Sequence, residues 1–265
     1  MLKMFDYQNQ GKKCIKMSNL TSNFYSGLSG LQVPVPKYLF PEPHQNSSRL
    51  TYYATFFNSI EINSTFYKLP LPKTISNWIA SVPEQFRFTF KLWRDITHLK
   101  NLDFKESDVE LFFNIISKAN HKKGCILIQF PPSLGSAHII QLDALLRCIA
   151  RNNINHEWKI AVEFRNKSWY IQDTYELLNI YNAGLVIQDI PKSITPMIDH
   201  LSDFIYIRFH GPTGNYRDSY AEEFLAEYAT YIKEWLNEGK TVYTYFNNTA
   251  GDAFRNLQSL NEFLF

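Results

Sequence analysis

The stretch from Lys159 to Arg165 carries charged side chains where a strand of a buried sheet would end. An extended backbone would place Val162 and Phe164 on one face of that strand. The opposite charges of Glu163 and Arg165 would then lie together on the other face. Strands of an all-parallel sheet are usually buried on both faces and read as continuous apolar runs. A charge pair at the end of such a strand therefore indicates a candidate site.

Strand-like runs of the same kind recur along the chain and would position further polar groups. They are short, rich in β-branched and aromatic residues, and stop at proline, glycine or polar residues. Phe86 to Lys91, for example, alternates with period two. The expected strands cover residues 24–30, 59–63, 86–91, 125–130, 159–165, 184–189, 204–210 and 241–246.

Between these strands the apolar residues change to helical spacing. In residues 108–119, for example, Val109, Phe112, Phe113 and Ile116 share one helix face. The segment after residue 189 is short and poorly patterned. Eight alternations of strand and helix in one chain fit an α/β fold with a single (β/α)₈ TIM-type barrel better than an open doubly wound sheet. The expected helices cover residues 48–57, 72–80, 108–119, 139–150, 170–181, 221–236 and 250–263.

Composition and charge set broad limits on domains and partners. A chain of 265 residues with 45% hydrophobic and 20% charged residues can build one large core. The formal charge of +2 gives no global field that would favour nucleic acid or a membrane surface. We expect a polar leader over residues 1–23 and the barrel over residues 24–265. No apolar run approaches the length of a membrane span, so no membrane contact is expected.

The cysteines point to a reducing compartment. Cys14, Cys125 and Cys148 are odd in number and have no paired spacing. This pattern argues against a disulfide framework and against a thiolate zinc site. We therefore expect a cytoplasmic protein.

Closure into a barrel predicts which polar side chains meet. Residues of one parity along each strand should face inward, and barrel enzymes build their sites at the C-terminal ends of the strands. The polar residues of this parity fall at those ends in seven strands, which predicts a shared mouth. The residues expected to face inward are Glu61, Asn63, Thr89, Lys91, Gln129, Glu163, Arg165, Asp189, Tyr206, Arg208, His210, Tyr245 and Asn247.

A purely structural interpretation competes with a functional one. The acids could pair with the bases in a self-satisfied ionic network that only fixes strand register. We favour a functional site because the charges gather at one end of the barrel and the loop residues His98 and Tyr216 join them. The balancing groups are Glu61, Glu163 and Asp189 against Lys91, Arg165 and Arg208.

Several motifs in this order resemble the YecE-like family, domain of unknown function 72. The resemblance runs from about Phe24 to the C-terminus and implies a single TIM-type barrel, without implying a reaction. One departure is Leu31, which follows Gly27-Leu-Ser-Gly30 where the family usually has tryptophan, so an aromatic wall of the pocket is expected to be missing. The motifs are Glu61-Ile-Asn-Ser-Thr-Phe-Tyr67, Ile96-Thr-His98, Gln129-Phe-Pro-Pro132, Ala161-Val-Glu-Phe-Arg165 with Ser168-Trp169, Arg208-Phe-His-Gly-Pro212 with Tyr216, and Tyr245-Phe-Asn-Asn248 with Ala250-Gly251.

The first functional hypothesis is an enzyme acting on an anionic substrate, either phosphate-bearing or nucleotide-like, with hydrolysis as one reaction. Guanidinium groups match phosphate oxygens, so Arg165, Arg208 and Lys91 would bind the anion. Glu61 or Glu163 would act as general base and His210 as general acid. The remaining predicted site residues are Asp189 with a catalytic role, and His98, Gln129, Tyr216, Asn247 and Asn248 with substrate-binding roles.

A cofactor is not expected, although one metal-dependent alternative stays open. Oxygen ligands would favour Mg²⁺ or Mn²⁺ over zinc. We rank this alternative lower because no recognised metal-ligand spacing is present and the arginines could replace a metal. The candidate ligands would be Glu61, Glu163, Asp189 and His210.

The second hypothesis is a non-catalytic protein that binds nucleic acid or a nucleotide, with aromatic residues stacking on bases. A glycosidase that uses Glu61 and Glu163 as its carboxylate pair ranks third, because nearby arginines would keep both acids ionised. Aromatic residues make up 16% of the chain. Those in or near expected loops are Phe66, Tyr67, Trp93, Trp169, Tyr170 and Tyr216.

Overall fold

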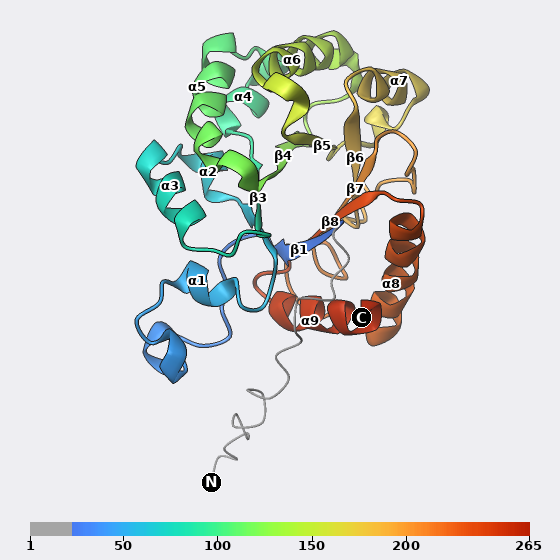
Figure 1. Cartoon of the computed structure of the whole chain (residues 1–265). Coiled ribbons are helices and arrows are strands. Elements are labelled where there is room, and N and C mark those ends of the chain that lie inside the picture. Colours follow the sequence, from blue (N-terminus) through green and yellow to red (C-terminus); the bar gives the residue numbers. More distant parts are fainter. Residues whose placement is uncertain (1–22) are drawn as a thin grey trace.

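The computed structural model describes residues 23–265 as a ring of strands surrounded by helices (Figure 1). The predicted leader therefore lies, but for Asn23, outside the described residues, as does Cys14. Within residues 23–265 the strands form one sheet of eight parallel strands, in the order β1-β8-β7-β6-β5-β4-β3-β2. The predicted (β/α)₈ barrel is confirmed. The strands are β1 (Phe24–Leu28), β2 (Ser59–Ile62), β3 (Arg87–Lys91), β4 (Lys123–Gln129), β5 (Lys159–Glu163), β6 (Ala183–Gln188), β7 (Phe204–Phe209) and β8 (Thr241–Phe246).

Side chains rather than a backbone ladder join β1 to β2 and complete the ring. The Asn58 side chain accepts from the Ser26 N–H at 2.8 Å and donates to the Phe24 carbonyl at 2.8 Å. The Tyr53 hydroxyl accepts from the Leu28 N–H and donates to the Ser59 carbonyl. A Cβ at Gly27 would lie 2.2 Å from the Ser59 carbonyl oxygen, so the two strands can approach only with glycine there.

Helices cover the outside of the strands, as their apolar faces predict (Figure 1). The expected helix over residues 48–57 is too long: α1 ends at Tyr53, and residues 54–56 form a tighter turn. The four-residue helices α2 and α4 were not predicted, because a single turn is too short to show a helical period. The helices are α1 (Arg49–Tyr53), α2 (Ser64–Tyr67), α3 (Pro72–Ala80), α4 (Arg94–Thr97), α5 (Glu106–Ile116), α6 (Ile139–Asn152), α7 (Gln172–Ile180), α8 (Glu222–Asn237) and α9 (Ala253–Leu264).

The connection from β6 to β7 departs from strict alternation, because no helix is assigned in residues 189–203. Pro191 and Pro196 interrupt this segment and remove backbone donors that a helix would need. Thr195 instead turns the chain back onto β6, where its hydroxyl donates to the Val186 carbonyl at 2.9 Å. The poorly patterned segment predicted after residue 189 is therefore a connection without a helix.

The inside of the barrel is filled below its mouth, which we define as the end where the strands have their C-termini. We call this filled part the lower interior. It is closed by packed rings and small apolar groups, and the Tyr245 hydroxyl bonds to the hydroxyls of Ser59 and Thr89 at 2.6 and 2.8 Å. The buried members of the lower interior are Cys125, Leu127, Ala161, Val186, Phe204, Tyr206, Tyr243 and Tyr245.

Two further expectations concern cysteines and membranes. Cys125 and Cys148 are buried free thiols. A search of the helices in residues 23–265 finds none long and apolar enough to cross a bilayer.

Candidate functional site

A cavity of about 240 Å³ opens at the mouth, where the predicted polar strand ends meet. Most of the predicted binding residues line it. Asn63 also lines it although it was predicted only to face inward, by the parity that it shares with Glu61. Tyr67, predicted as a ring that could stack on a base, lines it too. The lining residues are Asn63, Tyr67, Lys91, Gln129, Arg165, Arg208, Tyr216 and Asn247.

Arg208 lies at the floor of this cavity and joins two buried carboxylates. Its Nε donates to Glu61 Oε2 at 3.0 Å and its Nη2 donates to Glu61 Oε1 at 2.8 Å, which makes a bidentate pair. Its Nη1 donates to Glu163 Oε2 at 2.9 Å. The Tyr206 hydroxyl donates to Glu61 Oε2 at 2.5 Å. The two acids, Tyr206 and Arg208 are all buried, so these hydrogen bonds fix the position of the Arg208 guanidinium at the cavity floor.

Arg165 forms the second arginine contact to Glu163. The strand β5 ends at Glu163, so Arg165 stands just beyond the strand and above Arg208. It pairs with Glu163 through Oε1. Its Nη1 donates to the Tyr216 hydroxyl at 3.2 Å, and its Nη2 donates to Nε2 of His210 at 2.9 Å. The side chain of Arg165 is 10% exposed, so this guanidinium faces the cavity.

The two carboxylates of the network are poor general bases. Burial alone would raise the pKa of Glu61, but the charge and hydrogen bonds of Arg208 and the bond from Tyr206 lower it. Burial would likewise raise the pKa of Glu163, but the charges of Arg165 and Arg208 outweigh this effect and lower the pKa below its usual value. A general base works best with a pKa near the operating pH. Neither the predicted role of general base nor the glycosidase hypothesis, which needs one protonated acid, fits this environment.

His210 is held as a neutral imidazole. Its Nε2 accepts hydrogen bonds from Arg165 and, at 3.1 Å, from Arg208. A guanidinium can only donate, so this nitrogen must carry the lone pair. Its Nδ1 then carries the proton and donates to Asp189 Oδ1 at 3.2 Å. Burial lowers the pKa of His210. The predicted role of general acid is therefore corrected: His210 orients the two arginines and has no proton to give to the cavity.

Asp189 lies behind His210 rather than on the inner face. On β6 the inward parity belongs to Val186 and Gln188, which align with Tyr206 and Arg208 of β7. Asp189 follows the strand, and its Oδ1 accepts from the backbone N–H of His210 at 2.8 Å. Its Oδ2 accepts from the Tyr220 hydroxyl. The parity predicted for Asp189 is wrong, and its carboxylate supports His210.

Lys91 is the cation of the cavity that lacks a carboxylate partner. Its Nζ donates to Gln129 Oε1 at 2.9 Å and lies 4.2 Å from the centroid of the Phe66 ring. Within residues 23–265 no carboxylate oxygen lies within 4.0 Å of this nitrogen. Burial, and then the positive charge of Arg208, lower the pKa of Lys91 to about 8. The ammonium therefore makes no direct ion pair within residues 23–265, and Glu163 and Glu61 act on it only from a longer distance.

Two predicted binding residues lie outside the lining of the cavity. His98 packs its ring on Phe66 with centroids 4.8 Å apart, and burial followed by the charge of Lys91 lowers its pKa to about 4. Asn248 is fully buried and its amide donates to the Asp218 carbonyl and to Asn256 Oδ1. Both residues therefore contact neighbouring protein groups around the mouth and do not line the cavity.

Most of the aromatic residues predicted to stack on a ligand belong to the core. Trp169 is fully buried and stacks on Phe164 with centroids 4.7 Å apart. Trp93 and Tyr170 pack partly buried against the same core. Leu31 also packs on this core and lies outside the cavity lining, so position 31 supplies no aromatic wall to this cavity. Tyr67 and Tyr216 remain at the rim, 69% and 40% exposed.

The acids do not form a metal centre. No group of three or more His, Cys, Asp or Glu side chains in residues 23–265 is arranged to hold a metal ion. The oxygens of Glu61 and Glu163 already accept from arginines, and the Nε2 of His210 points at two guanidinium groups. The predicted Mg²⁺ or Mn²⁺ alternative therefore does not fit these residues.

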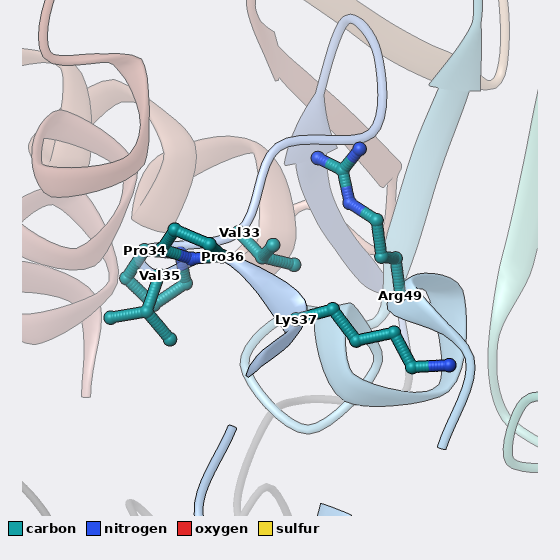
Figure 2. Close-up of a pocket in the computed structure, with 6 residues that line it drawn as sticks. All are labelled: Val33, Pro34, Val35, Pro36, Lys37 and Arg49. Atoms are coloured by element: carbon teal, nitrogen blue, oxygen red, sulfur yellow. The ribbon is translucent and has the colours of Figure 1, made fainter. Parts of the chain in front are cut away.

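A second cavity, of about 450 Å³, is lined by the loop between β1 and α1 and by the first residue of α1 (Figure 2). Figure 2 shows the charged ends of Lys37 and Arg49 pointing away from each other. Arg49 donates to the Leu31 carbonyl at 3.2 Å. The remaining lining is Val33 to Pro36, so this cavity lacks the converging polar groups that mark a binding site.

Comparison with known proteins places this chain in a family. The model of a family described as "Protein of unknown function DUF72" matches residues 25–265. The chain belongs to the DUF72 family. The resemblance found from the motifs is thereby confirmed, since its relatives include UPF0759 proteins named YunF and YecE.

Relatives in this DUF72 group cover much of the chain. The UPF0759 protein YunF of Bacillus subtilis (strain 168) is 25% identical over 265 residues, which span 85% of this chain and 90% of YunF. The UPF0759 protein YecE of Escherichia coli (strain K12) is 29% identical over 133 residues, which span 50% of this chain and 46% of YecE.

Solved structures show the same barrel. A DUF72 family protein from Thermotoga maritima MSB8 is 27% identical with a TM-score of 0.70, and the match covers 91% of this chain and 98% of that one. An AP endonuclease, family 2, from Brucella melitensis has a TM-score of 0.55 at 13% identity, covering 89% of this chain and 96% of that one. The second likeness shows a related fold only.

Proposed function

We propose that the mouth binds the phosphate group of a small anionic substrate and that the protein is an enzyme of phosphoester chemistry. One observation carries the proposal: Lys91, Arg165 and Arg208 converge on one cavity, and Lys91 has no carboxylate partner among the described residues. A phosphate bound there would supply the missing countercharge. Guanidinium forks and an ammonium are the groups that proteins use for this purpose.

The buried acids favour an anion rather than oppose it. The oxygens of Glu61 and Glu163 accept hydrogen bonds from the arginines and from Tyr206. These bonds hold the two guanidinium groups in place. Phosphoryl transfer depends mainly on positioning and on stabilising charge that develops on phosphate oxygens. A rigid pair of arginines at the cavity supplies both requirements.

Lys91 is the group best suited to move a proton. Its ammonium carries a proton, and its pKa of about 8 in the free protein is below that of an exposed lysine. Glu61 and Glu163 stay ionised, and the Nε2 lone pair of His210 accepts from the arginines. In the proposed hydrolysis, water attacks phosphorus and the bond from phosphorus to the leaving oxygen breaks. Lys91 gives its proton to that oxygen and regains one from water. The AP endonuclease fold likeness supports this reaction class by analogy alone.

The second candidate is a non-catalytic protein that binds a nucleotide or nucleic acid. The exposed rings of Tyr67 and Tyr216 at the rim favour it, because exposed aromatic side chains beside cations stack on bases. This candidate predicts binding without any chemical change of the ligand.

Turnover of phosphomonoesters and phosphodiesters, followed by ³¹P NMR, separates the two candidates. For the enzyme, Lys91→Met should lower kcat by about 10²-fold or more, the usual contribution of a proton donor. A chelator should leave turnover unchanged, because the acids do not form a metal centre. A ligand that binds but is recovered unaltered would support the second candidate. Loss of activity on chelation would contradict the arginine and lysine mechanism.

A further inference from the structure

The charges around the cavity cancel except for one. Arg208 pairs with both Glu61 and Glu163, and its side chain is only 1% exposed. Arg165 pairs with the other oxygen of Glu163. Within residues 23–265 these two guanidinium charges are therefore matched by two carboxylates. Lys91, which donates to an uncharged amide, carries the positive charge that is left over.

The other groups bonded to the lining add no positive charge. Gln129 is oriented by its own amide, which donates to the Phe130 carbonyl at 2.7 Å, so it offers Lys91 an uncharged oxygen. His210 is neutral, because its Nε2 accepts from both arginines. Asp189 lies behind His210 and adds a negative charge, and no Lys or Arg of the described residues pairs with it. The surplus at the site is therefore one positive charge at most.

Two of the three cations supply charged donors to a ligand in the cavity. Lys91 gives one of its three N–H groups to Gln129, and Nη1 of Arg165 gives one of its two to the Tyr216 hydroxyl. Both side chains line the cavity, from strands on either side of β4. Arg208 instead directs its N–H groups to the acids and to His210. Two adjacent charged groups thus meet the ligand, although their surplus is a single charge.

We infer that the substrate of the mouth is a phosphodiester rather than a phosphomonoester. The inference rests on the proposed phosphate site and names its substrate class. A phosphodiester carries one negative charge, shared by two oxygens, and the surplus charge of Lys91 neutralises it. A monoester carries nearly two negative charges at neutral pH. Its second charge would lie close to Glu163 without a countercharge, which is unfavourable for a charge that loses water.

The same balance favours release of the product. Hydrolysis of a diester breaks one bond from phosphorus to oxygen and yields an alcohol and a monoester. Lys91 gives its proton to the leaving oxygen and regains one from water, as proposed above. The monoester then loses a proton to the solvent and gains the second charge, so the mouth binds it more weakly than the substrate.

Calorimetric titration at pH 7.5 with three small anions tests this inference. Diethyl phosphate is the diester and ethyl phosphate the monoester. Ethyl methylphosphonate has the size of ethyl phosphate but a methyl group in place of one charged oxygen, so it separates charge from the second alkyl group. The wild type should bind both monoanions at least about tenfold more tightly than ethyl phosphate, because each avoids an unpaired charge.

A change of charge in the protein should shift this preference. Glu163→Gln raises the surplus by one and should improve the affinity for ethyl phosphate relative to diethyl phosphate by at least about tenfold. Asp189→Asn makes the same change without removing an arginine partner, and it should shift the preference in the same direction if Glu163→Gln does not fold. Asp203→Asn removes an exposed acid at the opposite end of the barrel and is the matched control, with an unchanged preference.

The outcomes distinguish failure of the inference from failure of the proposed function. Ethyl phosphate bound as tightly as the two monoanions, or tight binding of diethyl phosphate alone, would overturn the inference and leave the phosphate site intact. Propionate bound as tightly as diethyl phosphate would replace the diester by a carboxylate and overturn it as well. Absence of binding by all three phosphorus anions would overturn the proposed function and the inference with it.

Discussion

The lower interior and the mouth of this barrel are built by the same strands but are filled by different kinds of side chain. Tyr206 and Arg208 are two residues apart on β7, and Tyr245 and Asn247 are two residues apart at the end of β8. A step of two residues advances a strand by about 6.5 Å and keeps the side chain on the same face. Over that distance the inside changes from packed rings to an ionic network around a cavity.

The difference shows where the chain departs from what stability alone would favour. A buried ion network gains little over well-packed apolar residues of similar volume, because each charge loses its water. The lower interior follows that preference and pairs its Tyr245 hydroxyl with short neutral partners, Ser59 and Thr89. The mouth gathers the charges of Glu61, Glu163, Arg165, Arg208 and Lys91, and within residues 23–265 Lys91 has no carboxylate partner. A ligand explains this excess of charge better than folding does.

The largest expected effect comes from Arg208→Met, which leaves the fully buried Glu61 with the hydroxyl of Tyr206 but without its charged partner. Breaking one side of a buried pair is worth about 3–5 kcal/mol, so the free energy of unfolding measured in urea should fall by that amount. Phosphate binding should be lost as well. The double variant with Glu61→Gln should recover part of the stability, but no binding. Full stability of the single variant would show that water already compensates Glu61.

A change confined to the lower interior should affect stability alone. Tyr245→Phe removes a hydroxyl that bonds to both Ser59 and Thr89, and each bond contributes about 1 kcal/mol. We expect a loss of about 1–3 kcal/mol in the urea titration and an unchanged Kd for ethyl phosphate. A Kd that weakened in proportion to the stability loss would mean that the two regions are not separate.

The smallest effect is a pH dependence that should belong to the mouth. The pKa of Lys91 is lowered to about 8 in the free protein, and a bound anion should raise it again. The affinity due to this ammonium is therefore fully present below pH 8 and falls as the pH rises above it. The phosphate itself is already dianionic there, since its second pKa is about 6. Titrations between pH 7 and 10 should show this decline in the wild type and a flat profile in Lys91→Met.

Much of the architecture follows from local patterns in the chain. The alternation of apolar periods predicts eight strands, and closure of the ring brings Glu61, Lys91, Glu163 and Arg208 together, as the structure shows. The sequence after residue 189 has no clear helical spacing, in agreement with the lack of a helix after β6. The path of this segment, however, depends on the hydrogen bond that Thr195 makes to the strand.

The chemical states within the site could not be predicted in the same way. Strand parity predicts that the charges meet, but not which pairs form. In the structure Arg208 pairs with Glu61 and Glu163, and Arg165 pairs with Glu163, while Lys91 donates to Gln129. The position of the His210 ring proton depends on which ring nitrogen accepts from the arginines. Asn248 shares a motif with Asn247 yet points into the framework. These features depend on three-dimensional contacts that spacing along the chain does not encode.

The most direct test of the phosphate site is the calorimetric titration of ethyl phosphate into the wild type, Lys91→Met and Lys159→Met at pH 7.5. Lys159 begins β5 at the opposite end of the barrel and pairs with Asp203 at the surface, so its variant makes the same change of charge away from the mouth. We predict that Lys91→Met weakens binding by at least about tenfold, as loss of a charged hydrogen bond does, and that Lys159→Met leaves it unchanged. Equal affinities in all three proteins would contradict the assignment of the mouth as an anion site.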